Sequence, residues 1–343
     1  MKAAVIHQHG EVDCIRVEEL TEPVLAPGEA LVEVRAGALN HLDIWVRRGG
    51  RAKLTMPHVL GSDGAGVVAE VAPDVRNVSA GQEVVIHPGI WCGRCAACLR
   101  GEQSYCEHFG ILGMARPGTY AQYVAVPAAC LLPKPAHLDW AQAAALSLAH
   151  LTAWRMAVTR AGLQAGETVL IHGIGGGVAL AALQIAKMLS SVAIVTSSSD
   201  EKLARAARLG ADHAINYRTQ NVAERVKMLT GGRGADVAID TVGAATWETN
   251  LQSLRPGGRI ALCGVTAGPS AETNLQALYW GQFTILGSRL GTAEDFRQLL
   301  SAVAATKLVP VVDSTHALED VRGATARMEE GRQFGKIVLR IPE

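Results

Sequence analysis

The sequence lacks an excess of charge of either sign, and this absence limits the class of partner. Its 343 residues include 32 Lys and Arg against 32 Asp and Glu, so the formal net charge at pH 7 is zero. Nucleic acids and anionic membranes attract proteins through a surplus of basic residues, which this chain does not have. We therefore expect a small-molecule substrate, and neither a nucleic acid nor a membrane as partner.

Long apolar runs are also missing. No window approaches the about 18 consecutive apolar residues that a membrane helix needs. The opening segment MKAAVIHQHG has His7, Gln8 and His9 where a secretory signal needs an apolar core. Repeats, low-complexity runs and long linkers are absent as well. These absences together predict a cytoplasmic protein.

The hydrophobic content is 49%, which at this length predicts two domains. Roughly the first 130 residues contain short β-rich segments separated by Pro and Gly, a pattern typical of an antiparallel, barrel-like domain. From Asp139 onward Ala, Leu and Trp recur at helical spacing, and the strand-like segment ETVLIHG follows. A second domain is therefore expected to begin near residue 151.

Strands and helices then alternate regularly from ETVLIHG to GRIALCGV, which predicts a parallel, doubly wound sheet. One more helix, AEDFRQLLSAVAA, precedes the closing strand GKIVLRIP, which we expect to return to the first domain. The prediction is an α/β fold with a β-rich, barrel-like domain of residues 1–150 and 291–343 and a doubly wound, Rossmann-type domain of residues 151–290.

A glycine-rich segment at 173–179, GIGGGVA, lies between the first strand of this series and an apolar helix. Glycines allow a tight turn and close approach to a pyrophosphate, whose charge the amides and dipole of the following helix stabilise. A flexible turn is the alternative interpretation. The position at the head of a βαβ series favours a nicotinamide dinucleotide cofactor. We assign its binding to Gly175, Gly176, Gly177 and Val178.

The end of the next strand indicates which cofactor is used. An acidic residue there would bind the ribose hydroxyls of NAD and repel the extra phosphate of NADP. This chain instead has Thr196 and three serines, followed by Asp200, Glu201 and Lys202. The pattern favours NADPH, with NADH as the alternative, although the serines also suit a helix N-cap. The residues assigned to this part of the cofactor are Ser197, Ser198, Lys202 and Tyr217.

Four of the seven cysteines lie within residues 92–106. Cys92, Cys95, Cys98 and Cys106 form a C-x2-C-x2-C-x7-C pattern, and four thiolates in a closed tetrahedral set are typical of structural zinc. An iron–sulfur cluster is the main alternative, but ferredoxin patterns have a shorter last gap and a Cys-Pro ending. One structural zinc is therefore expected here, with no open position for catalysis.

Taken together, the barrel-like start, the cysteine lobe, the glycine loop and the closing FGKIVL resemble the zinc-type medium-chain dehydrogenase/reductase superfamily over essentially the whole chain. The stretches ALNHLDIWVRRG, HVLGSDGAGVV and LTAWRM resemble its quinone-oxidoreductase and enoyl-reductase-like branch. The resemblance implies a GroES-like catalytic domain, a Rossmann domain, and a homodimer or homotetramer.

Alcohol dehydrogenases of that family hold a catalytic zinc through a Cys in the first stretch and a Gly-His-Glu in the second. Here Asn40 stands at the Cys position and Gly61-Ser62-Asp63 replaces the second motif. Asn and Ser are poor zinc ligands, so the sequence predicts no catalytic zinc. An unconventional site made by Asp43, Asp63 and His150 remains the alternative, and with it a zinc-dependent alcohol dehydrogenase.

Without a metal to polarise a carbonyl, hydride transfer to a quinone or to an activated C=C bond is the less demanding chemistry. We expect Asn40, His41 and Ser62 to line the substrate pocket, with Asn40 or a hydroxyl donating to the developing oxyanion. Asp43 and Asp63 would organise the polar groups around them.

His150 is assigned as a proton donor, by its expected place facing the nicotinamide. For both His41 and His150, a structural, hydrogen-bonded histidine is the alternative. A protein that binds NADPH without turnover, as a sensor or structural protein, is the alternative to an enzyme.

Overall fold

The computed structural model describes residues 1–50 and 54–342, and the chain divides into two compact units. The first unit comprises Met1–Leu148 and Gly291–Glu343, and the second comprises Ala149–Leu290. Among the described residues, no helix combines the length and the apolar character that crossing a membrane requires.

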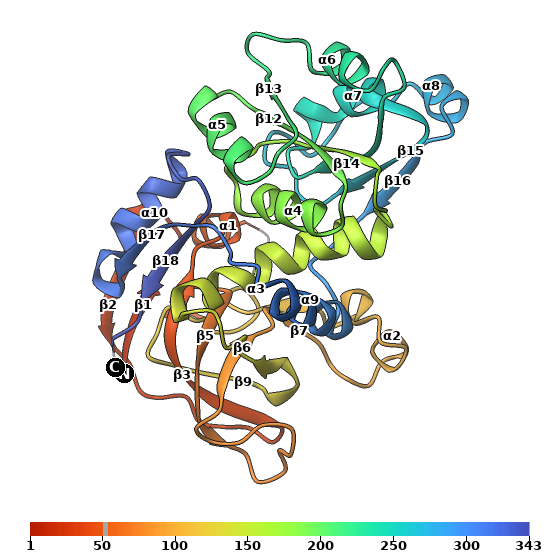
Figure 1. Cartoon of the computed structure of the whole chain (residues 1–343). Helices are drawn as coiled ribbons and strands as arrows, with labels where there is room; N and C mark the ends of the chain where they lie inside the picture. The colour runs from red at the N-terminus through yellow and green to blue at the C-terminus, as the bar shows by residue number, and fades with distance from the viewer. Residues whose placement is uncertain (51–53, 343) are drawn as a thin grey trace. The chain divides into compact units, whose positions relative to one another are not determined.

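The second unit contains a six-stranded parallel sheet (Figure 1). Its order is β13-β12-β11-β14-β15-β16. The chain adds β12 and β13 on one side of β11 and then returns to add β14, β15 and β16 on the other side, so the strand order switches between β11 and β14. Ligands of such sheets bind beyond the carboxyl ends of the strands at this switch point. The parallel α/β architecture predicted from the alternation is confirmed. The strands are β11 (Thr168–Ile171), β12 (Val192–Ser197), β13 (His213–Asn216), β14 (Ala235–Asp240), β15 (Leu254–Leu262) and β16 (Thr284–Gly287).

Helices flank this sheet because each has an apolar stripe to bury. In α4 the alanines and leucines from Ala179 to Ala186 are almost all buried, and the charged helix α5 buries only Leu203 and Ala206. The sheet core includes Leu170, Ile194 and Ile260. The helices of this unit are α4 (Gly177–Met188), α5 (Asp200–Arg208), α6 (Val222–Leu229), α7 (Ala244–Ser253) and α8 (Leu275–Trp280), while α3 (Trp140–Trp154) has residues in both units and continues as a π-helix (Arg155–Arg160).

The first unit is built on a seven-stranded, mainly antiparallel sheet in the order β10-β6-β5-β3-β18-β17, with β9 also paired to β3. Smaller sheets β2-β1-β4 and β7-β8 accompany it. The strands are β1 (Lys2–Ile6), β2 (Ile15–Glu19), β3 (Glu29–Ala38), β4 (His58–Val59), β5 (Asp63–Val71), β6 (Glu83–Ile86), β7 (Gly89–Ile90), β8 (Gly110–Ile111), β9 (Tyr123–Pro127), β10 (Leu131–Pro133), β17 (Val312–Ala317) and β18 (Lys336–Arg340).

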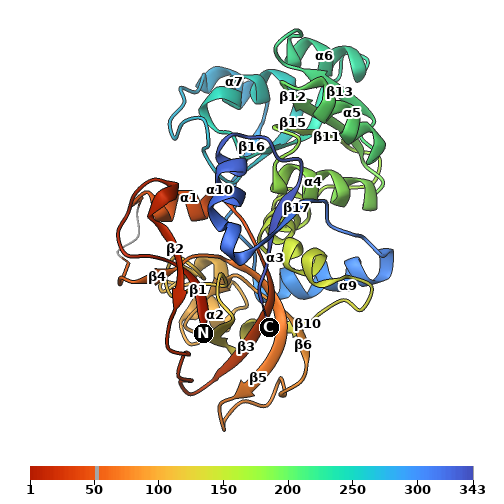
Figure 2. The same cartoon turned by 90° about the vertical axis from the view of Figure 1, so that its left-hand side faces the viewer.

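The closing strand β18 pairs antiparallel with β3, which confirms that the chain returns to the first unit. Its other neighbour, β17, runs parallel to it, an arrangement that the sequence patterns do not predict. The helix α10 (Val321–Glu329) connects β17 to β18 and packs against both (Figure 2). The remaining α-helices of this unit are α1 (His41–Arg47), α2 (Ala96–Leu99) and α9 (Ala293–Thr306).

Candidate functional site

Three strands of the first unit bring a polar cluster together. β3 ends at Ala38, which is paired with Asp63 at the start of β5 and with Val338 near the start of β18. Because β5 and β18 both run antiparallel to β3, their first residues lie beside the end of β3. The end of β3 leads into Asn40, so Asn40, Asp63 and Lys336 meet at one edge of the sheet.

Lys336 is the centre of this polar cluster. Its Nζ donates hydrogen bonds to the Leu39 carbonyl oxygen (2.6 Å), to Asn40 Oδ1 (2.6 Å) and to Asp63 Oδ2 (2.8 Å). An ammonium group has three hydrogens, so this side chain is fully satisfied within the protein. The lysine is only 4% exposed, and its charge is balanced by Asp63, which is completely buried.

Asn40 does not offer a free donor in this cluster. Its Nδ2 donates to Asp63 Oδ2 (3.0 Å) and to the Ala38 carbonyl oxygen (3.3 Å), while its Oδ1 accepts from Lys336. The hypothesis that Asn40 donates to a substrate oxygen therefore does not agree with these contacts. The physical reason is the buried lysine, which fixes the orientation of the amide.

The two aspartates hold the surrounding backbone. Asp63 Oδ1 accepts from the Leu148 amide (2.6 Å), and Asp43 Oδ2 accepts from the Asn40 amide (2.8 Å) and from the Tyr120 hydroxyl (2.7 Å). Asp43 is the third residue of α1, so its bond to Asn40 forms part of a capping box at the start of that helix. This agrees with their expected role as organising residues rather than as groups that react.

Burial raises the pKa of Asp43 to about 6, although the hydrogen bond from Tyr120 opposes the shift. Its second oxygen, Oδ1, has no hydrogen-bond partner in the described part of the chain. Burial raises the pKa of Tyr120 well above its ordinary value, and the charge of Asp43 adds to this shift. The Tyr120 hydroxyl therefore remains a donor to the carboxylate.

Ser62 and His41 differ in their accessibility. Ser62 is completely buried, and its Oγ donates to the Leu112 carbonyl oxygen (2.7 Å). His41, the first residue of α1, is exposed. The surrounding protein atoms disfavour its imidazolium, and with the charge of Lys336 they lower its pKa. His41 is thus the accessible titratable group beside the cluster, and it is neutral near pH 7.

His150 lies on α3, in the part of that helix that belongs to the second unit. It is 2% exposed, and its Nε2 lies 3.1 Å from Gln184 Oε1 on α4. This contact agrees with the alternative of a structural histidine.

The glycine loop follows β11 as predicted. Gly175 has a φ of 115°, a left-handed value that favours glycine, and Gly176 is the N-cap of α4. Gly177 and Val178 form the first turn of that helix, where the amides and the positive end of the dipole are available to an anion. The loop therefore has the geometry that a pyrophosphate requires.

The end of β12 lies beside this loop. The Ile174 amide donates to the Thr196 carbonyl oxygen (2.8 Å), and the Tyr217 amide donates to the Ser197 carbonyl oxygen (3.1 Å). Ser199 caps α5 by accepting from the Lys202 amide (3.3 Å). A Cβ placed on Gly175 would lie 2.9 Å from Cδ of Lys202, so the lysine side chain contacts the loop.

The residues assigned to the cofactor thus come together on one edge of the second unit. Ser198 is half-buried and the Tyr217 side chain is 51% exposed, so both are accessible at this edge. The serine cap and the assignment to the cofactor coexist, because Ser199 makes the cap while Ser197 and Ser198 precede it.

A buried polar chain supports the glycine loop, and the sequence patterns did not reveal it. His172 lies directly before the loop, with Nδ1 3.2 Å from Thr196 Oγ1 and Nε2 2.8 Å from Asn250 Oδ1. Asn250 in turn donates to Asp240 Oδ2 (2.6 Å) at the end of β14. Burial lowers the pKa of His172, against the opposing charge of Asp240, so the ring is neutral near pH 7. These hydrogen bonds join β11, β12, β14 and α7.

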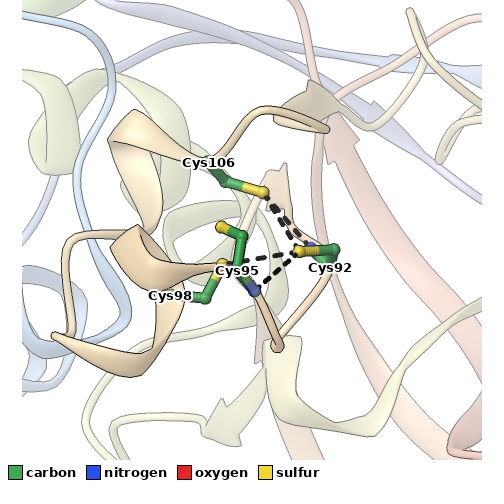
Figure 3. A group of neighbouring side chains, drawn as sticks. All are labelled: Cys92, Cys95, Cys98 and Cys106. Carbon is green, nitrogen blue, oxygen red and sulfur yellow. Dashed lines mark hydrogen bonds between the residues drawn. The ribbon is translucent and has the colours of Figure 1, made fainter.

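The four clustered cysteines form a site for a metal ion in the first unit (Figure 3). Their sulfur atoms all lie within 4.8 Å of one another, with Sγ of Cys92 3.9 Å from Cys98 and 3.6 Å from Cys106. Zinc–sulfur bonds of about 2.3 Å in a tetrahedron would separate the sulfurs by about 3.8 Å. The four thiols therefore fit a closed zinc site.

Backbone amides donate hydrogen bonds to two of these sulfur atoms. The Cys95 amide donates to Cys92 Sγ (3.4 Å), and the His108 amide donates to Cys106 Sγ (3.3 Å). Hydrogen bonds from backbone amides lower the pKa of Cys92, and they lower that of Cys95 to about 6. Burial raises the pKa of Cys98 to about 12, so a metal ion binding here displaces a proton.

Two family models match the chain. The zinc-binding dehydrogenase family matches residues 177–305, and the alcohol dehydrogenase GroES-like domain matches residues 26–136. Among curated proteins, an alcohol dehydrogenase of Geobacillus stearothermophilus is 32% identical over 350 residues, covering 100% of both chains. An NAD-dependent alcohol dehydrogenase of Sulfolobus acidocaldarius is 33% identical, covering 99% of this chain and 100% of the relative.

Solved structures give the same result. The crystal structure of an NAD-dependent alcohol dehydrogenase has a TM-score of 0.95 and 42% identity, with 100% of both chains covered. A thermostable alcohol dehydrogenase from Pyrobaculum aerophilum has a TM-score of 0.89 and 31% identity, with 99% of both chains covered.

Proposed function

The chain belongs to the zinc-type medium-chain dehydrogenase/reductase superfamily and is an oxidoreductase, and we propose that it transfers hydride from NADPH to a quinone or to an activated C=C bond without a catalytic zinc. The observation that carries the proposal is the contact of Lys336 with Asn40 and Asp63. The side-chain oxygens of Asn40 and Asp63 already accept hydrogen bonds from the ammonium group of Lys336.

The residues in the positions of the family's catalytic ligands do not fit zinc. Asn40 stands where the thiolate would be, and its amide is fixed by Lys336. Ser62 stands where the imidazole would be, and its hydroxyl donates a hydrogen bond to the Leu112 carbonyl oxygen. Neither side chain provides the sulfur or nitrogen donor that zinc prefers. We therefore propose that a hydrogen-bond donor of the protein stabilises the oxygen of the substrate.

His41 is our candidate for that donor. It is accessible, it lies at the start of α1 beside the polar cluster, and its lowered pKa keeps it neutral at the pH where NADPH is stable. A neutral imidazole has one N–H to donate to a developing enolate or phenolate oxygen. We expect His41→Phe to lower kcat by about 100-fold, the typical contribution of one such donor.

The glycine loop and the serines after β12 hold the cofactor, which supplies the hydride when it is bound. We propose NADPH because β12 ends in Ser197 rather than in an acidic residue, and because Lys202 contacts the loop. Several relatives are named NAD-dependent, which makes NADH the alternative. The ratio of kcat/KM values for the two cofactors decides between them.

The test of the reaction is a panel of oxidants with each cofactor. We expect oxidation of NADPH with quinones or conjugated enones, and much slower oxidation of simple primary and secondary alcohols by NADP+ or NAD+. Tight binding of NADPH, measured by its fluorescence, with no turnover on any substrate of the panel would instead identify a sensor or structural protein.

An alcohol dehydrogenase with a nonstandard metal site is the second candidate, because many of the relatives carry that name. It requires a second metal ion per chain besides the one in the cysteine cluster. Elemental analysis of protein purified without a chelator separates the two candidates. One zinc per chain agrees with the reductase, and two zinc ions per chain favour the alcohol dehydrogenase.

We also propose that two copies of the chain associate through the edge of the second unit formed by α8 and β16. The sheet ends at β16, whose Thr284 and Ile285 are exposed, and α8 exposes Leu275 (70%), Tyr279 (63%) and Trp280 (78%). An exposed strand edge beside large apolar side chains is a typical pairing surface. Trp280→Glu should shift the protein to monomer in size-exclusion chromatography, whereas Val24→Glu, on the other unit, should not.

A further inference from the structure

The first unit contains a pocket of about 510 Å³ beside the strands β3, β18 and β17. Pockets that bind small organic molecules typically measure about 300–1,000 Å³, so this one has room for a compound of that class. The segment that leads into α3 and the last described residues of the chain close its sides. None of its lining residues belongs to the polar cluster, the glycine loop or the cysteine cluster, so it is distinct from those sites. We call it the Arg340 pocket.

Strand pairing leaves Arg340 between two small side chains. It is paired with Ala36 of β3 on one side and with Ala317 of β17 on the other. Paired residues of neighbouring strands point to the same face of a sheet, so these three side chains share one face. Because both neighbours are alanines, space remains open around the arginine side chain, and all three residues line the pocket.

The guanidinium of Arg340 is the unpaired cation of the pocket. Two other charged residues of the lining have partners: Glu319 forms an ion pair with Lys2 (2.8 Å), and Arg35 forms one with Glu33 (3.0 Å). Arg340 is exposed, and its guanidinium forms no hydrogen bond or ion pair with any residue that the structure describes. An arginine side chain binds a carboxylate through two parallel hydrogen bonds. The pocket therefore offers a site for one carboxylate.

Two acidic residues of the lining limit the charge of the ligand. Asp139 accepts from the Gln142 amide (2.8 Å), and its own amide donates to Gln142 Oε1 (3.1 Å), so the pair forms a capping box at the start of α3. A second negative group on the ligand would face the carboxylates of Asp139 and Glu319 without another unpaired cation of the lining to meet it. The pocket thus favours a ligand with a single negative charge.

Trp140 gives the pocket an aromatic wall. The side chain is half-buried, and Lys134 Nζ lies 5.0 Å from the centroid of its ring, a cation–π contact that holds the ring in place. Lys134 is held in turn by an ion pair with Glu83 (3.1 Å). Val338 adds apolar surface, and the exposed Thr315 hydroxyl has no partner among the described residues. A flat apolar body with few polar groups fits such a lining.

We propose that the Arg340 pocket is a second ligand site, which binds an aromatic monocarboxylate. The carboxylate pairs with Arg340, and the ring lies against Trp140. The site lies outside the groups that are assigned to the hydride transfer, so the proposal does not rest on the reductase activity.

The experiment measures the binding of 2-naphthoate to the zinc-loaded protein by isothermal titration calorimetry, with the cofactor site saturated with NADPH and again without cofactor. We expect one 2-naphthoate per chain. Arg340→Gln should weaken its binding about 10- to 100-fold, the range for a hydrogen bond to a charged group. Arg16→Gln, which removes an exposed arginine of β2 in the same unit, is the matched control and should leave the affinity unchanged.

Two further probes test the charge of the ligand on the wild-type protein alone. Naphthalene-2-methanol, which has no charge, and naphthalene-2,6-dicarboxylate, which has two, should each bind at least tenfold more weakly than 2-naphthoate. Trp140→Leu should weaken 2-naphthoate by about two- to tenfold, as expected for the loss of an aromatic contact.

Equal affinities of the wild type and Arg340→Gln for 2-naphthoate overturn the proposal. So does the absence of binding at about 1 mM, the range of a weak complex. Should Arg340→Gln not fold, the series of three probes on the wild type decides, and equal binding of the uncharged probe contradicts the proposal. No substrate is turned over in these titrations, so their result stands whether or not the protein oxidises NADPH.

Discussion

His172 Nε2 lies 2.8 Å from Asn250 Oδ1, and this hydrogen bond joins the residue before the glycine loop to helix α7. Asn250 uses its Nδ2 to bind Asp240, so its Oδ1 is the atom that faces the imidazole. The imidazole is then neutral with its proton on Nε2, while Nδ1 accepts from Thr196. The imidazole of His172 therefore connects the end of β11 to β12, at the edge of the sheet where the cofactor is expected.

His172→Phe fills the same volume but removes both hydrogen bonds. Two buried partners are left unsatisfied, each at a cost of about 1–3 kcal/mol, and the loop loses its support. We expect a lower melting temperature together with a roughly tenfold weaker binding of NADPH, measured by fluorescence titration. A change confined to stability would argue against a role in positioning the loop.

Asp236→Asn is the matched control for this experiment. Asp236 lies at the other end of β14, where Arg233 and Arg255 bind it and lower its pKa to about 2. Its substitution should destabilise the same sheet without weakening cofactor binding, because the glycine loop follows the opposite ends of the strands.

Asp43 predicts a dependence of stability on pH. Burial raises its pKa from 3.8 to about 6, so between these values the folded protein holds a proton that the unfolded chain has released. Its contribution to stability is complete below pH 3.8 and is lost as the pH rises through about 6. The full shift corresponds to about 3 kcal/mol.

Asp43→Asn should remove this dependence. Its carbonyl oxygen can still accept from the Asn40 amide and from Tyr120, while the group no longer ionises. Urea unfolding of both proteins at intervals between pH 4 and 7 measures the difference. Parallel profiles for the wild type and the variant would show that Asp43 does not titrate in this range.

The parts of this molecule that the sequence predicts correctly depend on local patterns. Alternating strands and helices, with a glycine loop after the first strand, are set by neighbouring residues, so the parallel sheet of the second unit was predictable. The spacing of Cys92, Cys95, Cys98 and Cys106 likewise brings four thiols together within a short segment. Their zinc content remains a prediction.

The polar cluster could not be predicted, because its members are brought together by strand pairing far along the chain. Lys336 and Asp63 are 273 positions apart, and a lysine beginning a strand normally extends into solvent. The same contact explains why the donor role expected for Asn40 does not agree with the structure. The one local signal was a lysine directly before the apolar run IVL, which alone does not indicate burial.

Removal of the metal ion from the cysteine cluster should destabilise the first unit without abolishing the chemistry. We expect Cys95→Ser to lose the zinc and to lower the melting temperature by about 5 °C or more, since a closed metal site contributes directly to folding energy. The kcat of the remaining folded protein should stay near that of the wild type. Cys14→Ser, outside the cluster, should retain full zinc. Complete loss of turnover in folded Cys95→Ser would instead indicate a metal ion that takes part in catalysis.

Lys202 gives the sharpest test of cofactor preference. Its backbone amide is bound by Ser199, so removal of the side chain leaves the cap of α5 intact. A hydrogen bond to a charged group contributes about 1.5–3 kcal/mol, which corresponds to a factor of about 10 to 100 in binding. Lys202→Ala should therefore raise the KM for NADPH by that factor and leave the KM for NADH nearly unchanged. Arg208→Ala, exposed at the end of the same helix, controls for the general loss of positive charge. An equal change for both cofactors would mean that Lys202 binds no 2′-phosphate, and the preference for NADPH would then have no support from this helix.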